Sequence, residues 1–223
     1  MPNATLSQSG QPGSPALPGT KLIVAAVLAL WFVLVVLLGA GRAFVTPPGT
    51  PPLPIFVGVT TPVVVFLAAY WISRPLRALV LAADLRLMLG IQAWRFAGLG
   101  FLALYTHGVL PGSFALPTGL GDMAIGVTAP WLLVALIRRP AFAASKTFVL
   151  WNALGVLDLV VAVGSGALGS ALASGVAGEI TTAPMGLLPL LLIPAYFVPI
   201  FLMLHLAAFF QARRLANKLK GHA

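Results

Sequence analysis

Six stretches of about 20 mostly apolar residues, each long enough to cross a lipid bilayer, constrain this chain more than any other feature. Hydrophobic residues make up 60% of the sequence and charged residues only 8%, whereas soluble domains carry about 25% charged residues. Backbone groups inside a bilayer must bond within their own segment, which favours helices. We therefore predict an all-α membrane protein, a six-transmembrane-helix bundle. The expected helices cover residues 22–41, 54–73, 89–110, 119–138, 147–166 and 187–211.

Prolines lie between and within these segments. The run 47–54 contains five prolines and predicts a stiff, extended connector between the first two helices. Three more prolines fall within the sixth expected helix, where each removes a backbone hydrogen bond, so we expect Pro-kinked helices. These three are Pro189, Pro194 and Pro199.

Two segments allow more than one interpretation. Residues 76–110 would form a helix of about 50 Å, too long for one crossing. Residues 76–88 have apolar side chains at helical spacing with charged residues on the flanks, which is typical of an interfacial amphipathic helix. A break near Gly90 would then precede the third span, and the alternative is a cytosolic extension of that span. We expect residues 166–186 to form an outer loop, with a helix extension or a re-entrant loop as the alternatives.

Basic residues in the connecting segments indicate the orientation. Eleven lysines and arginines fall on one side of the six-span arrangement and only Arg42 on the other. Because short cytoplasmic loops are enriched in basic residues, both termini are expected in the cytosol. The eleven are Lys21, Arg74, Arg77, Arg86, Arg138, Arg139, Lys146, Arg213, Arg214, Lys218 and Lys220. We expect an integral protein of a bacterial inner membrane, with anionic lipid headgroups bound on its cytosolic side.

The charge pattern and the composition argue against several other classes of protein. The net charge is +9, but the basic residues lie in short loops and not on one face of a folded domain, so we expect no nucleic-acid partner. The absence of cysteine excludes disulfides and thiolate metal sites. We divide the chain into a disordered cytosolic tail (1–20), a transmembrane domain (21–212) and a basic cytosolic tail (213–223). Homo- and hetero-oligomers both remain open.

Arg95 is the only lysine or arginine in the interior of an expected span, between residues 89 and 110. A cation at that depth costs about 2.5–3.5 kcal/mol on insertion scales, so it implies a partner, a wet cavity or a path to water. The best partner is Asp158, near the midplane of the fifth expected helix. Such a pair would either join two helices structurally or act as a gate or anion clamp. Gly155 lies on about the same helical face as Asp158 and would let another backbone approach.

A second pair of polar residues is expected near the outer boundary. His107 and Asp122 flank the short connection between the third and fourth expected helices. We expect the two side chains to meet at an outer mouth, where a His–carboxylate contact would titrate near neutral pH and accept protons. We favour the alternative of an ordinary hydrogen bond at the end of a loop, with Asp122 in the first turn of its helix.

Together the intramembrane polar residues describe a path that we call the polar trail. Counted along each helix, four of its members lie within about 5–10 Å of the cytosolic boundary. These are Gln92, Arg95, Asn152 and His205, while Asp158 lies near the midplane and Asp122 and His107 near the outer boundary. The first hypothesis is movement of a proton, ion or small solute along this trail. The second is a structural or assembly subunit of a membrane complex.

An enzyme is the third and least favoured hypothesis. The sequence has no HExxH, DxxxD or DDxxD motif and no cluster of histidines, so we expect neither a metal site nor any catalytic residue, and the cofactor is unknown. Ser165 and His205 are expected at opposite membrane faces, too far apart for a catalytic pair. An enzyme acting on lipid or quinone would place Arg95 or His205 near the inner headgroups.

Overall fold

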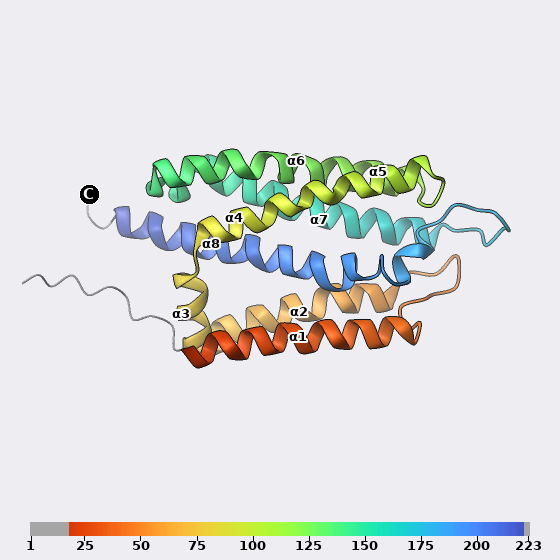
Figure 1. Ribbon diagram of the computed structural model, residues 1–223, viewed down its shortest axis with the longest axis horizontal. Coiled ribbons are helices and arrows are strands. Elements are labelled where there is room, and N and C mark those ends of the chain that lie inside the picture. Colours follow the sequence, from red (N-terminus) through yellow and green to blue (C-terminus); the bar gives the residue numbers. More distant parts are fainter. Residues whose placement is uncertain (1–17, 221–223) are drawn as a thin grey trace, which may run out of the picture.

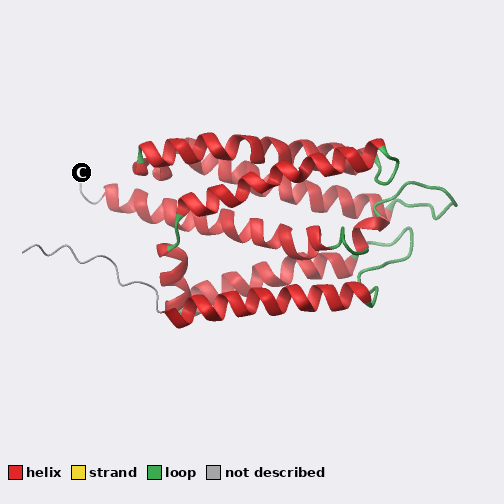
Figure 2. Cartoon of the chain, viewed as in Figure 1, coloured by secondary structure: helices red, strands yellow, loops and turns green. Residues whose placement is uncertain are grey.

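The computed structural model describes residues 18–220 as a bundle of helices (Figure 1). Within these residues no strand is present (Figure 2). Six helical segments are long and apolar enough to cross a membrane, which confirms the predicted six-helix membrane bundle. They are Gly19–Ala40, Leu53–Ile72, Leu85–Thr106, Gly112–Arg138, Lys146–Ala171 and Ile193–Lys220.

Several helix starts follow from capping residues in the sequence. α2 (Leu53–Ile72) begins with proline in its first turn, where the missing N–H has no cost. α3 (Arg74–Ala82) and α7 (Lys146–Ala171) begin after serines whose hydroxyls accept backbone N–H groups of the first turn. Asp84 caps α4 (Leu85–Gln92) in the same way, through the N–H of Arg86 at 2.8 Å.

α3 is the expected interfacial helix, but it is shorter than predicted. It runs across one end of the bundle, transverse to the long helices (Figure 1). The helix ends at Ala82 and the chain breaks at Ala83 and Asp84, so the predicted extent 76–88 and the break at Gly90 are wrong. The aspartate cap starts a new helix at Leu85 because its carboxylate satisfies an otherwise unpaired N–H.

The third span is not a uniform α-helix. It consists of α4, a 3₁₀ segment η1 (Ala93–Gly98) and α5 (Leu99–Thr106). Arg95 therefore lies in the 3₁₀ segment, halfway along the span. Mid-helix 3₁₀ segments are uncommon and often mark a hinge or a functional site.

α6 (Gly112–Arg138) begins seven residues earlier than predicted. Pro117 and Pro130 are both inside it, and the glycine-rich sequence between them does not interrupt it. Asp122 therefore lies about 15 Å along the helix and not in its first turn. The expected position of Asp122 near the outer boundary is wrong for this reason.

The segment between the fifth and sixth spans, which was predicted to be an outer loop, is partly helical. α7 continues to Ala171, so residues 166–171 extend the fifth helix, and the outer loop proper follows. A short 3₁₀ turn, η3 (Ala183–Gly186), precedes the sixth span, which begins with the π-helical turn η4 (Ile193–Phe197) and continues as α8 (Val198–Lys220). Pro189 lies in a turn before the helix and does not kink it. Pro194 lies in the π-helical turn.

α6 and α8 make most of the contacts between the spans. α6 packs against all three parts of the third span and against α7, while α8 packs against α7, α2, α3 and α4. α1 (Pro18–Ala40) lies at the periphery (Figure 1) and presents many exposed leucines and valines, as expected of a helix facing lipid. Tyr196 anchors it by packing against Trp31 and Phe32 and donating to the carbonyl of Leu28.

The start of α1 and the end of α8 lie at the same end of the bundle, together with α3 (Figure 1). The eleven basic residues named above belong to this end, whereas Arg42 lies at the opposite end with the longer loops. The proposed N-terminal tail falls almost entirely outside the described residues. Residues 213–220 of the proposed C-terminal tail continue α8 as helix.

Candidate functional site

Five polar side chains from four spans meet near the middle of the bundle, and we call them the polar cluster. Arg95, Asp122, Asp158 and His205 lie about 15–18 Å from the start of their spans, and Asn152 lies about 9 Å from the start of α7. Half of the hydrocarbon core is about 15 Å, so the cluster sits near the midplane. Its members are Arg95 of η1, Asp122 of α6, Asn152 and Asp158 of α7, and His205 of α8.

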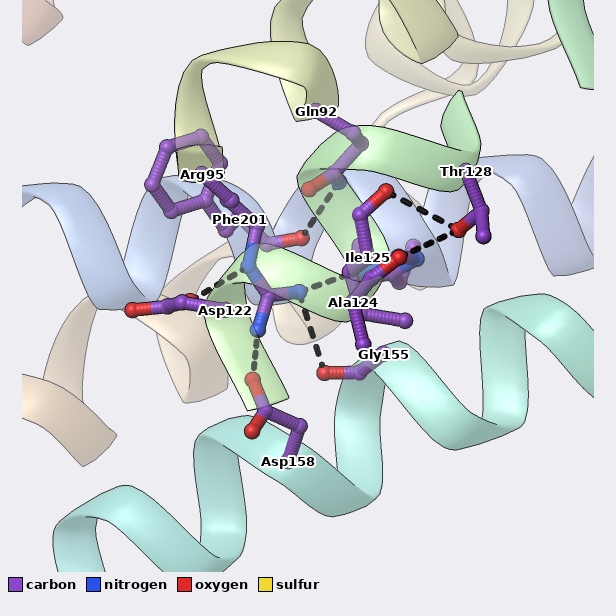
Figure 3. Close-up of polar contacts among 10 residues, drawn as sticks. Gln92, Arg95, Asp122, Ala124, Ile125, Thr128, Gly155, Asp158 and Phe201 are labelled. Atoms are coloured by element: carbon purple, nitrogen blue, oxygen red, sulfur yellow. Dashed lines mark hydrogen bonds and ion pairs between the residues drawn. The ribbon is translucent and has the colours of Figure 1, made fainter. Parts of the chain in front are cut away.

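Arg95 is the centre of the cluster (Figure 3) and its side chain is 0% exposed. Its Nε donates to Oδ1 of Asp122 at 2.7 Å and its Nη2 donates to Oδ2 of Asp158. Its Nη1 donates to the carbonyl of Gly155 at 3.3 Å and lies 3.2 Å from Nε2 of His205. One guanidinium thus joins four spans, and each of its three nitrogens has a partner.

The contact with Arg95 determines the tautomer of His205. A guanidinium can only donate hydrogen bonds, so Nε2 of His205 must accept and its proton must be on Nδ1. Nδ1 then donates to Oδ1 of Asn152 at 2.9 Å, and the Asn152 amide donates to the carbonyl of Phe148 at 2.9 Å. This chain of hydrogen bonds fixes a neutral imidazole beside the guanidinium. Trp151 packs edge-on against the same ring, with centroids 5.6 Å apart.

The formal charges of the cluster do not cancel. Asp122 and Asp158 supply two carboxylates against the single guanidinium of Arg95, and His205 is neutral. The ionised cluster therefore carries one excess negative charge. An unbalanced charge near the midplane is costly, so this charge calls for a proton or another cation.

Glycines allow the helices to approach closely around the cluster. A side chain at Gly126 would collide with the backbone at Phe96, one at Gly155 with the His205 ring, and one at Gly121 with the Asp158 carboxylate. Gly98 lies against the Asp122 side chain in the same way. These small residues bring η1 and α7 close to α6, and α8 close to α7, which allows short polar contacts.

A cavity connects the polar cluster with the end of the bundle opposite the termini. Its volume is about 100 Å³, and Asp122 lies on its wall. Apolar side chains line most of the rest, including Phe101, Phe114 and Leu159. Residues of the two loops at that end form the mouth, among them Thr46, Pro48 and Thr181. Asp122 is 15% exposed, so a solute in the cavity can reach it.

Two buried polar groups have no hydrogen-bond partner among the described residues. One is the hydroxyl of Thr118, which is 2% exposed, lines the cavity and lies one helical turn from Asp122. The other is Oε1 of Gln92, whose amide nitrogen donates to the carbonyl of Phe201 at 3.4 Å. Unpaired buried polar groups are rare in native proteins and need an explanation.

The structure brings together most of the residues expected to matter. The predicted ion pair between Arg95 and Asp158 is present. The predicted contact between His107 and Asp122 is wrong, because α6 starts earlier and carries Asp122 inward to Arg95, while His107 stays exposed at the end of α5. The expected polar trail is also wrong in its geometry, since Arg95, Asp122, Asp158 and His205 gather near one depth, and Asn152 lies about 9 Å from Asp158 along α7.

The structure also bears on a residue that the sequence analysis missed and on the enzyme hypothesis. Thr118 was not foreseen from the sequence, and its spacing of four residues before Asp122 is the signal that identifies it. His205 is fully buried and both ring nitrogens are engaged, so it does not lie at the headgroups as an enzyme acting there would need. No group of three or more potential metal ligands occurs among residues 18–220.

The fold and the cluster define a multi-pass integral membrane protein with a buried ion-pair site. A family model described as a domain of unknown function, DUF8737, matches residues 52–213. The chain belongs to this family. The match begins after α1 and includes every member of the polar cluster together with Thr118 and Gln92. No curated protein and no solved structure matches the chain.

Proposed function

We propose that this protein is a transporter that moves a proton, or a small solute coupled to a proton, with the polar cluster as the proton site. The observation that carries the proposal is the charge imbalance of the cluster beside a cavity. Asp122 and Asp158 outnumber Arg95, and Asp122 is reached from the cavity. A carboxylate that is in excess near the midplane gains or releases a proton as its surroundings change.

The charged and titratable groups around Asp122 restrict where the proton binds. Arg95 faces Asp122 from η1 and Asp158 approaches from α7, while His205 of α8 bonds to Arg95 and Asn152. The Arg95 guanidinium only donates hydrogen bonds, and the lone pair of His205 on Nε2 already accepts one. The two aspartates are therefore the groups that exchange the proton.

The interruption of the third span supports movement at this site. η1 carries Arg95 and packs against α6 through Gly126 without an intervening side chain. Discontinuous helices near the midplane are common where transporters bind their substrates. A shift of η1 relative to α6 would separate Arg95 from Asp122 and change the affinity of that carboxylate for a proton.

Proton flux into sealed proteoliposomes tests the proposal. Purified protein would be reconstituted in vesicles that contain a pH-sensitive dye, with valinomycin and potassium to balance charge. We expect flux in the parent and loss of flux in Asp122→Asn, because an amide cannot exchange a proton. Asp84→Asn is the matched control, since it removes a carboxylate at an exposed helix cap that asparagine also fills. Absence of flux in the parent, with and without added solutes, would reject transport.

The alternative function is a structural subunit in which the cluster only joins helices. It is supported by the complete burial of Arg95 and by the partners of all three of its nitrogens. A structural role requires geometry alone and gives no reason for a second, partly exposed carboxylate or for the cavity. A folded parent protein without any flux would favour this alternative.

We also propose an inner-membrane location with both termini in the cytosol and anionic lipid at the basic end. A shallow pocket there is formed by Tyr70, Trp71, Leu81 and Phe210 with the basic residues of α8. Aromatic rings beside arginine are suited to the headgroup region, where the rings meet acyl chains and the cations meet phosphate.

A further inference from the structure

The inner part of the cavity offers hydrogen-bond acceptors that the protein itself does not use. Arg95 bonds to Oδ1 of Asp122, and the second oxygen points away from the guanidinium (Figure 3). Among the described residues, no hydrogen bond to that second oxygen is formed. The hydroxyl of Thr118, one turn away on the same helix, is also unpaired and lines the same cavity. Two neighbouring oxygens are thus available to one donor group.

The charges around these two oxygens favour a ligand whose hydrogen-bond donor is a cation. The cluster holds two carboxylates and one guanidinium, and the guanidinium of Arg95 is 0% exposed behind its partners. An anionic ligand would meet the Asp122 carboxylate before any cation, and a cationic N–H group would meet charge-assisted acceptors. This geometry disfavours the anion clamp considered from the sequence.

The apolar walls of the cavity favour a ligand whose remaining part is apolar. Phe101, Phe114 and Leu159 are each no more than 5% exposed and line the cavity, together with Met185 and Val198. Burial of apolar ligand surface in such a site is favourable. A ligand that matches both regions has an apolar body and one ammonium group.

We propose that the cavity binds a small amphipathic organic amine, with its ammonium group on Asp122 and Thr118 and its apolar body among the phenylalanines. This inference rests on the proposed function in one respect, since the amine would be the solute whose movement is coupled to the proton. The ammonium group and the proton then compete for the same excess charge. Binding itself does not depend on transport.

Binding of two isosteric probes to the parent protein in detergent tests the inference. The probes are 2-(1-naphthyl)ethylamine, which is a cation near neutral pH, and 2-(1-naphthyl)ethanol, which is neutral. Isothermal titration calorimetry should give an amine affinity about 10- to 100-fold higher, the value expected for a charge-assisted hydrogen bond in a buried site. Equal affinities, or no binding of the amine, would overturn the proposal without the need for any variant.

Variants then locate the site. Asp122→Asn should remove most of the preference for the amine over the alcohol, and Thr118→Val should reduce it by a smaller factor. Asp84→Asn, on the end of α4, should leave both affinities unchanged. An unchanged preference in folded Asp122→Asn protein would reject this site. Amine binding without proton flux would reject the transport function alone, and proton flux without amine binding would reject this inference alone.

Discussion

Nη1 of Arg95 lies 3.2 Å from Nε2 of His205, and this single contact fixes the protonation of the histidine. Because arginine only donates, the imidazole is neutral with its proton on Nδ1, directed at Asn152. The histidine therefore acts in the cluster as an acceptor that orients the guanidinium. Its own orientation depends on the asparagine amide, which is held by the backbone of α7.

The tautomer of His205 is the first prediction. Nitrogen NMR of protein labelled at histidine should show, near neutral pH, one buried ring protonated on Nδ1 only. Asn152→Leu removes the acceptor of that proton and should mix the tautomers or shift the signal. The exposed His107 provides an internal reference. A buried ring protonated on Nε2 in the parent would contradict the arrangement described here.

The second prediction concerns the close approach of α7 and α8. Alanine at Gly155 would collide with the His205 ring, so Gly155→Ala should lower the thermal unfolding midpoint in detergent. Overpacking of a close-packed site costs about 1–3 kcal/mol. Gly164→Ala is the matched control in the same helix, because no neighbouring atom lies within 4 Å of the added carbon. The control should be neutral or slightly stabilising, since alanine favours helix by about 1 kcal/mol over glycine.

A carboxylate outside the membrane spans gives the third prediction. Glu179 in the outer loop accepts from the backbone N–H and hydroxyl of Ser174 and the N–H of Gly175 at 2.8–3.1 Å. These bonds, chiefly that from the Ser174 backbone, hold the pKa of Glu179 below its ordinary value of 4.5. A depressed pKa means that the carboxylate stabilises the loop above pH 4.5, and that this stabilisation is lost as the pH falls through the lower, folded-state pKa.

Amide hydrogen exchange measures this effect. Glu179→Gln should speed exchange at Ser174 and Gly175, and acidification of the parent below the ordinary pKa should weaken the same protection after correction for intrinsic rates. The Met185 amide, which bonds to the carbonyl of Thr182 at 2.9 Å, serves as the reference. Equal protection in the parent and the variant would show that the carboxylate does not hold the loop.

The sequence predicted the six spans well because each is a long apolar run, and a bilayer leaves a backbone few alternatives to helix. It also predicted the Arg95–Asp158 pair, because a lone cation near a lone carboxylate in lipid has few other solutions. The positions of the helix ends were less predictable. The Asp84 cap and the inclusion of Pro117 in α6 moved two boundaries by several residues.

Those boundary errors account for the errors at the site. A start of the third span at Leu85 in place of 89 moves Arg95 to the midplane, and a start of α6 at Gly112 in place of 119 moves Asp122 to the same depth. The spacing of residues along the sequence does not predict how far each helix is rotated about its own axis relative to its neighbour. The contact between His205 and Gly155 depends on that rotation, so the sequence indicated a small residue at Gly155 but not which ring it admits.

Orientation in the membrane is the fourth prediction. The chain has no cysteine, so single cysteines can be introduced without background. Val176 in the outer loop is 68% exposed, and Asn217 is exposed at the basic end. We expect Val176→Cys to react with an impermeant maleimide in intact spheroplasts, and Asn217→Cys to react only after permeabilisation, because basic loops stay in the cytosol. The opposite pattern would invert the proposed topology.

The last prediction follows from the charge count of the polar cluster. Asp122→Asn or Asp158→Asn alone leaves one carboxylate for Arg95, so the charges of the cluster then balance. Each single variant should lower the free energy of unfolding by about 1–2 kcal/mol, the value of one lost hydrogen bond. The double variant leaves the guanidinium buried without a counterion and should cost about 3–5 kcal/mol beyond the sum of the single losses. Arg95→Gln added to the double variant should recover part of that loss, because no charge then remains. Unfolding of the parent and the four variants in one detergent provides the comparison, and strictly additive losses would show that the two aspartates do not share Arg95.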